Sequence, residues 1–356
     1  MKKHAAFWIR GVAFACVLAL CLHGLGLVLA PKFDLKDVYP TTATLMEFYQ
    51  LEEDSVDVLV LGSSHSMTAI DPQVLYDSWG YTAYNLSGEQ QSAFLSSYLL
   101  EEAFKTQHPS VVVLETHFLF DYFDATPPLN TEEPYVHKAL DFMKPSLTRL
   151  KAVAEAAWYR PDFGFFNLLF PAVRYHTRLH SLSREDYDRD RFQRTENLLG
   201  FGPQARLLTV GWYSVLEYME VENAEPEPMM PLMAECLERM RSMCEANGAE
   251  LLLIKTPSAS QTPGRCRAMH DYADAHGLRF LDFNEEDVYY SQLEYDFYAY
   301  NADADHLNIW GAQRVSDYLG MVLCDEMGVE GRGQHPYWDE ASIRHVELVE
   351  SKLEEF

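Results

Sequence analysis

The stretch VDVLVLGSSHSMTAI, residues 56–70, decides the fold. Its first part, residues 56–61, is a short and mostly apolar run, which is typical of a strand buried on both faces. The run stops at Gly62, and three serines and a histidine follow at once in residues 63–66. Two hypotheses explain such a cluster behind a buried strand. The hydroxyls cap the helix that begins there, or they mark a place where chemistry happens.

Four further apolar segments read as strands, and helical patterns separate them. We predict strands at residues 81–87, 110–116, 249–257 and 278–284, and core helices at 92–107, 230–248, 264–277 and 309–328. Short apolar strands that alternate with amphipathic helices favour a parallel sheet with helices on both faces. The sequence therefore predicts an α/β fold with a doubly wound, five-stranded parallel sheet. In such sheets, sites gather beyond the carboxyl ends of the strands.

The alternation breaks in the middle of the chain. Residues 121–230 show no clean strand and are rich in aromatic and helical patterns, so we predict a helical insertion over the sheet. The α/β domain as a whole is expected to span residues 31–330. The acidic tail, residues 331–356, is expected to be helical and peripheral.

Residues 1–30 have the character of a membrane anchor. The segment 11–30 contains no Asp, Glu, Lys or Arg, and twenty residues of helix match the hydrocarbon thickness of a bilayer. Lys2, Lys3 and Arg10 precede it, which by the positive-inside rule places the N-terminus in the cytoplasm and the rest of the chain outside. A cleaved signal peptide is the alternative reading.

Composition excludes some classes of function. Of the 356 residues, 48% are hydrophobic, which is ample for one large core, and the formal net charge is −26. Such an acidic domain is not expected to bind nucleic acid or to dock on anionic lipid. The six cysteines show no spacing typical of a zinc site or a disulfide framework. We therefore expect no metal, no cofactor and free, mostly buried thiols.

A second polar cluster follows the last predicted strand. In NADADHLNIWGA, residues 301–312, Asp303 lies three residues before His306, directly ahead of a helix. A serine hydroxyl becomes a good nucleophile when a histidine takes its proton and a carboxylate orients that histidine. Both clusters are expected on one rim of the sheet, so His306 could serve Ser64. The alternative is a helix-entry loop with solvated acids.

Four blocks of the sequence together resemble the SGNH, or GDSL-type, hydrolase superfamily. They are LGSSHS at 61–66, YNLSGEQ at 84–90, VVVLETHF at 111–118 and DADHLNIWGA at 303–312. The resemblance runs from about residue 56 to about residue 320. Its first and last blocks are the most specific.

The resemblance implies a role for particular residues. Ser64 would be the nucleophile, His306 the general base and Asp303 the acid that orients it. The backbone amides of Ser64 and Gly88 would receive the oxyanion. The family's Asn in the third block is replaced here by His117. Its ring would donate in place of that Asn, or the oxyanion hole would rely on the amides of Ser64 and Gly88 alone.

The first block departs from the family pattern as well. The usual Gly-Asp-Ser is Gly-Ser-Ser in this chain, which makes Ser63 a competing nucleophile. Asp305, next to His306, is expected to point away from it or toward solvent. His65 is adjacent to Ser64 and is a poor candidate for its base, because neighbours on a turn or helix point apart.

The anchor and the insertion resemble the extracytoplasmic branch of the superfamily, which modifies cell-envelope polymers and includes the D-alanyl transfer proteins of teichoic acids. This resemblance implies a serine esterase or O-acyltransferase that acts on an acylated envelope glycan or polymer, and a membrane acyltransferase as a partner. An inactive envelope assembly or binding protein with the same fold is the alternative.

Overall fold

The computed structural model describes residues 2–31, 41–120, 127–187, 198–209 and 211–354. Its centre is one five-stranded sheet in the order β2-β1-β3-β4-β5, and every neighbouring pair is parallel. The strands are β1 (Val58–Leu61), β2 (Ala83–Asn85), β3 (Val111–Glu115), β4 (Glu250–Lys255) and β5 (Arg279–Asp282). The predicted α/β class, the five-stranded parallel sheet and all five predicted strands are confirmed.

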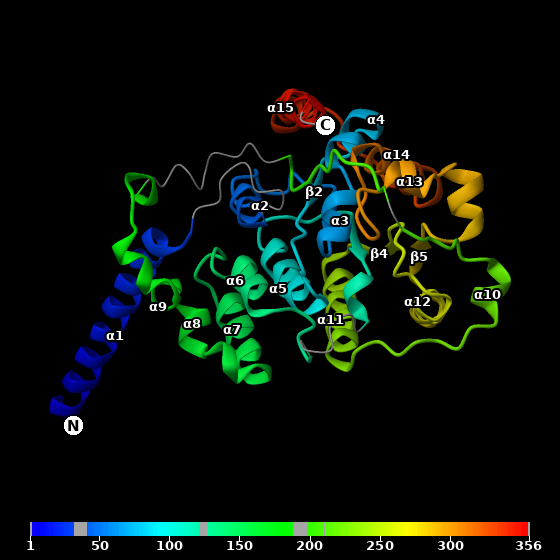
Figure 1. Ribbon diagram of the computed structural model, residues 1–356. Coiled ribbons are helices and arrows are strands. Elements are labelled where there is room, and N and C mark those ends of the chain that lie inside the picture. The colour runs from blue at the N-terminus through cyan, green and yellow to red at the C-terminus, as the bar shows by residue number, and fades with distance from the viewer. Residues whose placement is uncertain (1, 32–40, 121–126, 188–197, 210, 355–356) are drawn as a thin grey trace.

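Two helical layers cover the sheet (Figure 1). On one face lie α5 (Ala93–Ala103) and α11 (Pro231–Asn247), and on the other lie α4 (Pro72–Trp79) and α14 (Ile309–Met321). Neighbouring strand residues point into different layers: Leu59 packs into the α5 side and Val60 into the α14 side. Both faces are buried, which explains why the strands read as continuous apolar runs.

The insertion is helical, as predicted. Its described helices are α6 (Glu133–Leu140), α7 (Leu147–Tyr159), α8 (Phe165–Leu169), α9 (Pro171–Arg174) and α10 (Tyr218–Glu222), with short 3₁₀ turns between them. Helices α6 to α8 form an outer layer beyond α5 (Figure 1), whereas Leu199 accepts the Asn85 backbone N–H at 2.9 Å beside β2 and Leu216 pairs with Glu285 beyond β5. The face of the sheet on this side is covered by α5 and α11. Residues 121–126 and 188–197 of the insertion lie outside the described residues.

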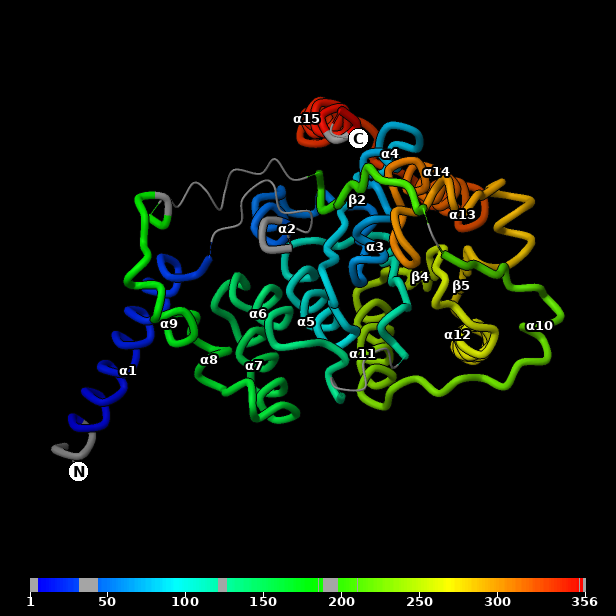
Figure 2. The backbone as a smooth tube through the Cα atoms, viewed as in Figure 1, coloured from blue at the N-terminus to red at the C-terminus, as the bar shows by residue number. Residues whose placement is uncertain are grey.

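Helix α1 (Lys2–Leu29) is long and apolar enough to span a membrane. Its segment Ala6–Leu29 has a mean hydropathy of 2.5, and a signal sequence would meet the same description. Figure 2 shows α1 at one end of the molecule with α9 beside it. A Cβ at Gly26 would lie 3.3 Å from the Pro171 Cβ, so the two helices approach closely.

The acidic tail forms α15 (Pro336–Glu354), as predicted, but its first turn is not peripheral. Trp338 is fully buried, and its indole Nε1–H donates to the Ala83 carbonyl at 2.9 Å. Tyr337 donates its hydroxyl to Glu47 at 2.8 Å. The start of the tail is therefore part of the core beside β2. Glu47 belongs to the helix α2 (Thr41–Phe48). The short helix α3 (Ser64–Ala69) follows β1.

Candidate active site

The segments that follow β1, β2 and β3 meet at one rim of the sheet, as predicted. The Ser66 hydroxyl donates to the Ser87 Oγ at 2.8 Å, which joins the first segment to the second. The His65 ring stacks on the His117 ring with 3.4 Å between centroids, which joins the first segment to the third. The small polar residues after the strands thus pack against one another.

Gly62 makes the tight turn between β1 and α3. Its φ is +154°, in the region that favours glycine. A Cβ at this position would lie 2.4 Å from the Ser66 Oγ and 2.8 Å from the Glu115 Cβ. Only a residue without a side chain fits between β3 and the first turn of α3. This close fit brings the following serines to the rim.

Ser63 and Ser64 have different tasks. Ser63 is the N-cap of α3: it is 1% exposed, and its Oγ accepts the His65 backbone N–H at 3.3 Å. Ser64 is the first residue of α3 and is partly exposed, and its Oγ lies 2.8 Å from the His306 Nε2. Each of the two hypotheses for the serine cluster therefore holds for a different residue, since Ser63 caps the helix and Ser64 contacts a histidine.

Asp303 fixes the His306 ring from the opposite edge. Its Oδ1 lies 2.9 Å from the His306 Nδ1, and the same oxygen accepts the backbone N–H groups of Asp305 at 3.0 Å and His306 at 2.9 Å. An Asp that accepts amides two and three residues ahead makes a compact local turn. The turn directs one ring nitrogen to the carboxylate and leaves the other for Ser64. The expected Asp303 to His306 contact is present.

The Asp303 carboxylate is held in its charged form. Burial would raise its pKa, but the hydrogen bond and the charge of His306 and the two backbone amides hold the pKa well below its usual range. The other oxygen, Oδ2, accepts from the Arg206 Nη2 at 2.7 Å. Sequence reasoning missed Arg206, which lies 97 residues away in a segment without a motif.

Asp305 faces another part of the molecule. Its Oδ1 accepts the hydroxyls of Ser258 at 2.6 Å and Ser260 at 2.8 Å, both in the segment after β4. This is the expected orientation away from His306. The two acids of the DADH motif therefore differ in role: Asp303 holds the histidine, while Asp305 ties the motif to the neighbouring loop.

Two further histidines lie beside the triad and are buried. The His65 ring is 5.1 Å from the His306 ring, and His117 stacks on the other side of His65. Burial, followed by nearby positive charges that include Lys255, keeps the pKa of both rings well below the usual value. Both rings are therefore neutral near pH 7, and a neutral imidazole keeps one N–H to donate.

A buried ion pair holds the backbone at His117. The Lys255 Nζ lies 3.1 Å from the Glu115 Oε1, and the other oxygen of Glu115 accepts the His117 backbone N–H at 3.1 Å. Both charged side chains are at most 2% exposed. Burial raises the pKa of Glu115, and the lysine charge opposes this effect. The pair joins the ends of β3 and β4 directly beneath the rim.

The expected oxyanion donors are not equally available. The Gly88 N–H donates to the Gly62 carbonyl at 3.3 Å, so it is engaged within the rim in this conformation. The Ser64 N–H belongs to the first turn of α3, where an amide has no acceptor within the helix. Of the two backbone donors expected, the Ser64 amide is therefore the better placed.

Two cavities of the described structure lie at the anchor and not at the triad. The larger, of about 480 Å³, is lined by residues 16, 19, 20 and 23 of α1 and by residues 145, 146, 149, 150, 169 and 170 of the insertion. The smaller, of about 290 Å³, lies between α1, α2 and residues 141–145. Neither is lined by Ser64, His306 or Asp303.

Comparison with known proteins identifies no relative: no family model and no curated protein matches this chain. What the site can do must therefore be argued from its own geometry. A hydroxyl, an imidazole and a carboxylate are aligned in that order through two hydrogen-bond contacts of 2.8 and 2.9 Å. This arrangement can move a proton off the hydroxyl and stabilise the resulting imidazolium.

Proposed function

We propose that the chain is an SGNH-type serine enzyme that hydrolyses or transfers acyl esters. The observation that carries the proposal is the alignment of Ser64 Oγ, His306 and Asp303, with 2.8 Å from the hydroxyl to Nε2 and 2.9 Å from Nδ1 to the carboxylate. Distances of about 2.6–3.2 Å between nucleophile and base, with a third group orienting the base, are typical of an activated nucleophile. The parallel sheet and the position of the site at its carboxyl rim are consistent with that family.

The first half of the reaction uses all three residues. The Ser64 oxygen attacks the ester carbonyl carbon while His306 Nε2 takes the hydroxyl proton. A tetrahedral intermediate forms, and the charge of Asp303 stabilises the imidazolium. When the carbon–oxygen bond to the alcohol breaks, His306 returns the proton to the leaving oxygen. The product is an acyl ester on Ser64 and a free alcohol.

The second half regenerates the enzyme. A water molecule or an acceptor hydroxyl gives its proton to His306 and attacks the carbonyl carbon of the acyl-serine. The bond from that carbon to the Ser64 oxygen then breaks while His306 returns the proton to this oxygen, which restores the hydroxyl and releases a carboxylic acid or a new ester. We place the developing oxyanion against the Ser64 amide and the His117 ring. The Gly88 amide would join them only if its contact with the Gly62 carbonyl opened. A missing donor costs about 10²–10³ in turnover, so slow turnover is expected.

We further propose that the reaction takes place outside the membrane on an acylated envelope glycan or polymer. The support is the apolar helix α1 and the basic residues Lys2, Lys3 and Arg10 that precede its apolar core. A membrane acyltransferase that loads the acyl group is the partner that such an anchor would bring close. The net charge of −26 supports a neutral or cationic surface as substrate more than a strongly anionic one.

A second candidate function rests on two observations. The engaged Gly88 amide and the histidine in place of the family's Asn leave the oxyanion site weaker than the family pattern. An envelope-binding or assembly protein that keeps the fold without turnover would have such a site. The two functions differ in whether Ser64 is reactive, which labelling can measure directly.

The test uses the full-length protein in detergent, with a fluorophosphonate probe and a small acetyl ester. We expect the probe to label the wild type once per chain, and Ser64→Ala to lose both labelling and turnover while its thermal unfolding midpoint is kept. The matched control is Ser63→Ala, which removes the cap hydroxyl. It should cost about 1 kcal/mol of stability and keep labelling.

The outcomes separate the hypotheses. If Ser63→Ala removes labelling and Ser64→Ala does not, the nucleophile is Ser63. If a folded wild type is never labelled and turns over no ester, the enzyme proposal is wrong and the binding function stands.

A further inference from the structure

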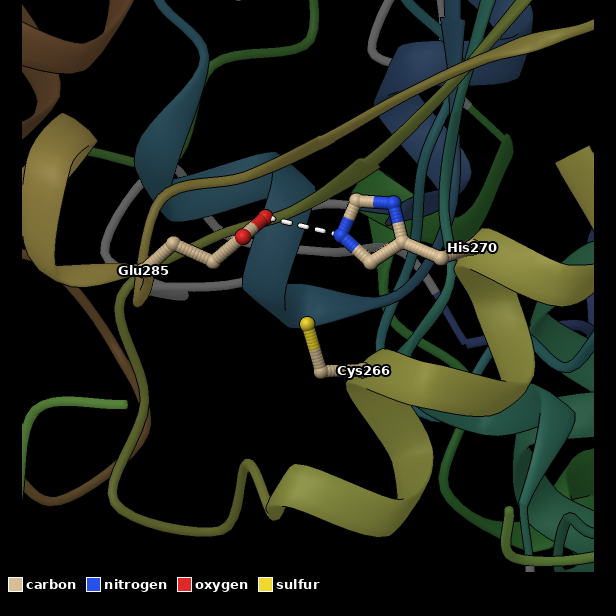
Figure 3. Close-up of side chains that lie close together, drawn as sticks. All are labelled: Cys266, His270 and Glu285. Atoms are coloured by element: carbon tan, nitrogen blue, oxygen red, sulfur yellow. Dashed lines mark hydrogen bonds and ion pairs between the residues drawn. The ribbon is translucent and has the colours of Figure 1, made fainter. Parts of the chain in front are cut away.

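A second cluster of reactive side chains lies away from the triad, on the outer side of β5. Cys266 and His270 project from α12 (Pro263–His276), and Glu285 faces them from the segment that follows β5 (Figure 3). The His270 Nε2 lies 2.9 Å from the Glu285 Oε1. The three potential ligand atoms all lie within 4.8 Å of one another.

The helix explains why two of these side chains converge. Residues four apart lie on the same face of a helix, one turn above the other. Cys266 and His270 have this spacing, and both face the loop that carries Glu285 (Figure 3). The loop is itself fixed, because the Glu286 backbone N–H donates to the Leu216 carbonyl at 2.9 Å. The third ligand is therefore presented by a second, independently anchored segment.

The surroundings of the cluster are negative. Cys266 is fully buried, and Asp282, also fully buried, lies nearby at the end of β5. The carboxylate of Asp282 accepts from Asn284 at 2.9 and 2.7 Å and also from Gln261, so it is held in place. A cation would relieve this concentration of acidic groups.

We propose that Cys266, His270 and Glu285 bind a zinc ion. Thiolate, imidazole and carboxylate are the ligands that Zn²⁺ takes in proteins, and three protein ligands leave a fourth position for water. Zinc ligands at about 2.0–2.3 Å in a tetrahedron stand roughly 3.3–3.8 Å apart. The three atoms, which all lie within 4.8 Å of one another, reach this arrangement when His270 and Glu285 separate slightly and the Cys266 sulfur closes on them.

Binding would release the thiol proton of Cys266 and replace the hydrogen bond between His270 and Glu285 with two metal bonds. The ion would cross-link α12 to the segment after β5. Its role in this position is to stabilise the fold beside β5. Ser64 and His306 take no part in the site, so zinc binding and ester turnover are separable.

The experiment measures metal binding by the full-length protein in detergent, after removal of bound metal with a chelator. We expect one Zn²⁺ per chain on reloading, with a higher thermal unfolding midpoint. Co²⁺ should bind in its place and give a thiolate-to-cobalt charge-transfer absorption that Zn²⁺ then removes. Binding should weaken as the pH falls, because protons compete for the ligands.

Three variants and one control test the assignment. Cys266→Ala should lose the charge-transfer absorption, and His270→Gln and Glu285→Gln should each weaken Co²⁺ binding by more than the 10–100-fold typical of a second-sphere change. The control, Cys244→Ala, removes a buried thiol of α11 and should leave binding unchanged. If Cys266→Ala does not fold, the two other variants decide, since both keep the thiol.

A wild type that retains no zinc would overturn the proposal. So would a charge-transfer absorption that persists in Cys266→Ala or is unchanged in both other variants. The cluster would then be an ion pair between His270 and Glu285 beside a buried thiol.

Discussion

Two clusters in this molecule combine a nucleophilic atom, an imidazole and a carboxylate, but they arrange them differently. In the rim triad, the two ring nitrogens of His306 face different partners: Nε2 faces Ser64 at 2.8 Å and Nδ1 faces Asp303 at 2.9 Å. In the α12 cluster, the Nε2 of His270 faces Glu285, and all three ligand atoms of the cluster lie within 4.8 Å of one another.

The two arrangements differ in the chemistry that they support, which is proton transfer in one and ion binding in the other. An imidazole between a hydroxyl and a carboxylate can pass charge from one edge to the other, which suits proton transfer. Donor atoms that converge on one point cannot relay a proton in that way, but they can surround an ion. The same three kinds of side chain therefore support two proposals, and variants of the two acids can separate them.

The largest effect is expected from Asp303, the carboxylate that orients His306. Asp303→Asn should lower kcat for a small acetyl ester by about 10⁴, because an amide favours the wrong tautomer of His306. Glu285→Gln should leave kcat unchanged, since it holds no group of the triad. Steady-state kinetics on both variants measures the contrast.

Asp305→Asn is the matched control within the same motif. Its carboxylate accepts from Ser258 and Ser260 and not from His306, so the loss in kcat should be small. A large loss in Asp305→Asn with little loss in Asp303→Asn would contradict the geometry of the relay. Equal losses in Asp303→Asn and Glu285→Gln would remove the distinction between the two clusters.

A smaller effect is expected from His117, which we propose as a donor to the oxyanion of the substrate. If the neutral His117 ring donates to the oxyanion, His117→Ala should lower kcat by about 10²–10³ with little change in KM. His117→Asn, which restores a side-chain N–H, should recover part of this loss. The control is His137→Gln, a buried histidine that bonds to Asp141 away from the site. An unchanged kcat in His117→Ala would leave the amides as the only donors.

Local patterns predicted the strands and the turn that joins Asp303 to His306, because each depends on neighbours in sequence. The apolar runs gave β1 to β5, and the three-residue spacing of Asp303 and His306 is enough to form their turn. The parallel topology then brought Ser64 to His306 across 242 residues. That prediction rested on the general rule that sites in parallel sheets gather beyond the carboxyl ends of the strands.

What the sequence missed depends on how distant segments pack. No residue close to Gly88 in the sequence indicates that its amide donates to the Gly62 carbonyl, because that hydrogen bond depends on how the two loops pack together. The α12 cluster was missed because Cys266 looks isolated until Glu285 is folded against it. The i, i+4 spacing of Cys266 and His270 indicates two ligands on one helix face, but it does not indicate the third, Glu285.

The smallest effect is expected at Arg206. Its side chain is 56% exposed and that of Asp303 is 38% exposed, and exposed ion pairs contribute about 0.2–1 kcal/mol. The Oδ1 of Asp303 already accepts two backbone amides and faces the His306 Nδ1, so the carboxylate stays in place without the arginine. Because 1.36 kcal/mol corresponds to a tenfold change in rate, Arg206→Gln should lower kcat by at most about fivefold.

Salt distinguishes this weak support from a catalytic role. At 1 M salt the screening length falls to about 3 Å, so the difference between Arg206→Gln and the wild type should largely disappear. Arg279→Gln, which removes another exposed arginine, paired with Glu326, should change nothing at either ionic strength. A loss of a hundredfold or more in Arg206→Gln that persists at high salt would contradict this account. Arg206 would then act on the substrate itself, and the relay would need a fourth member.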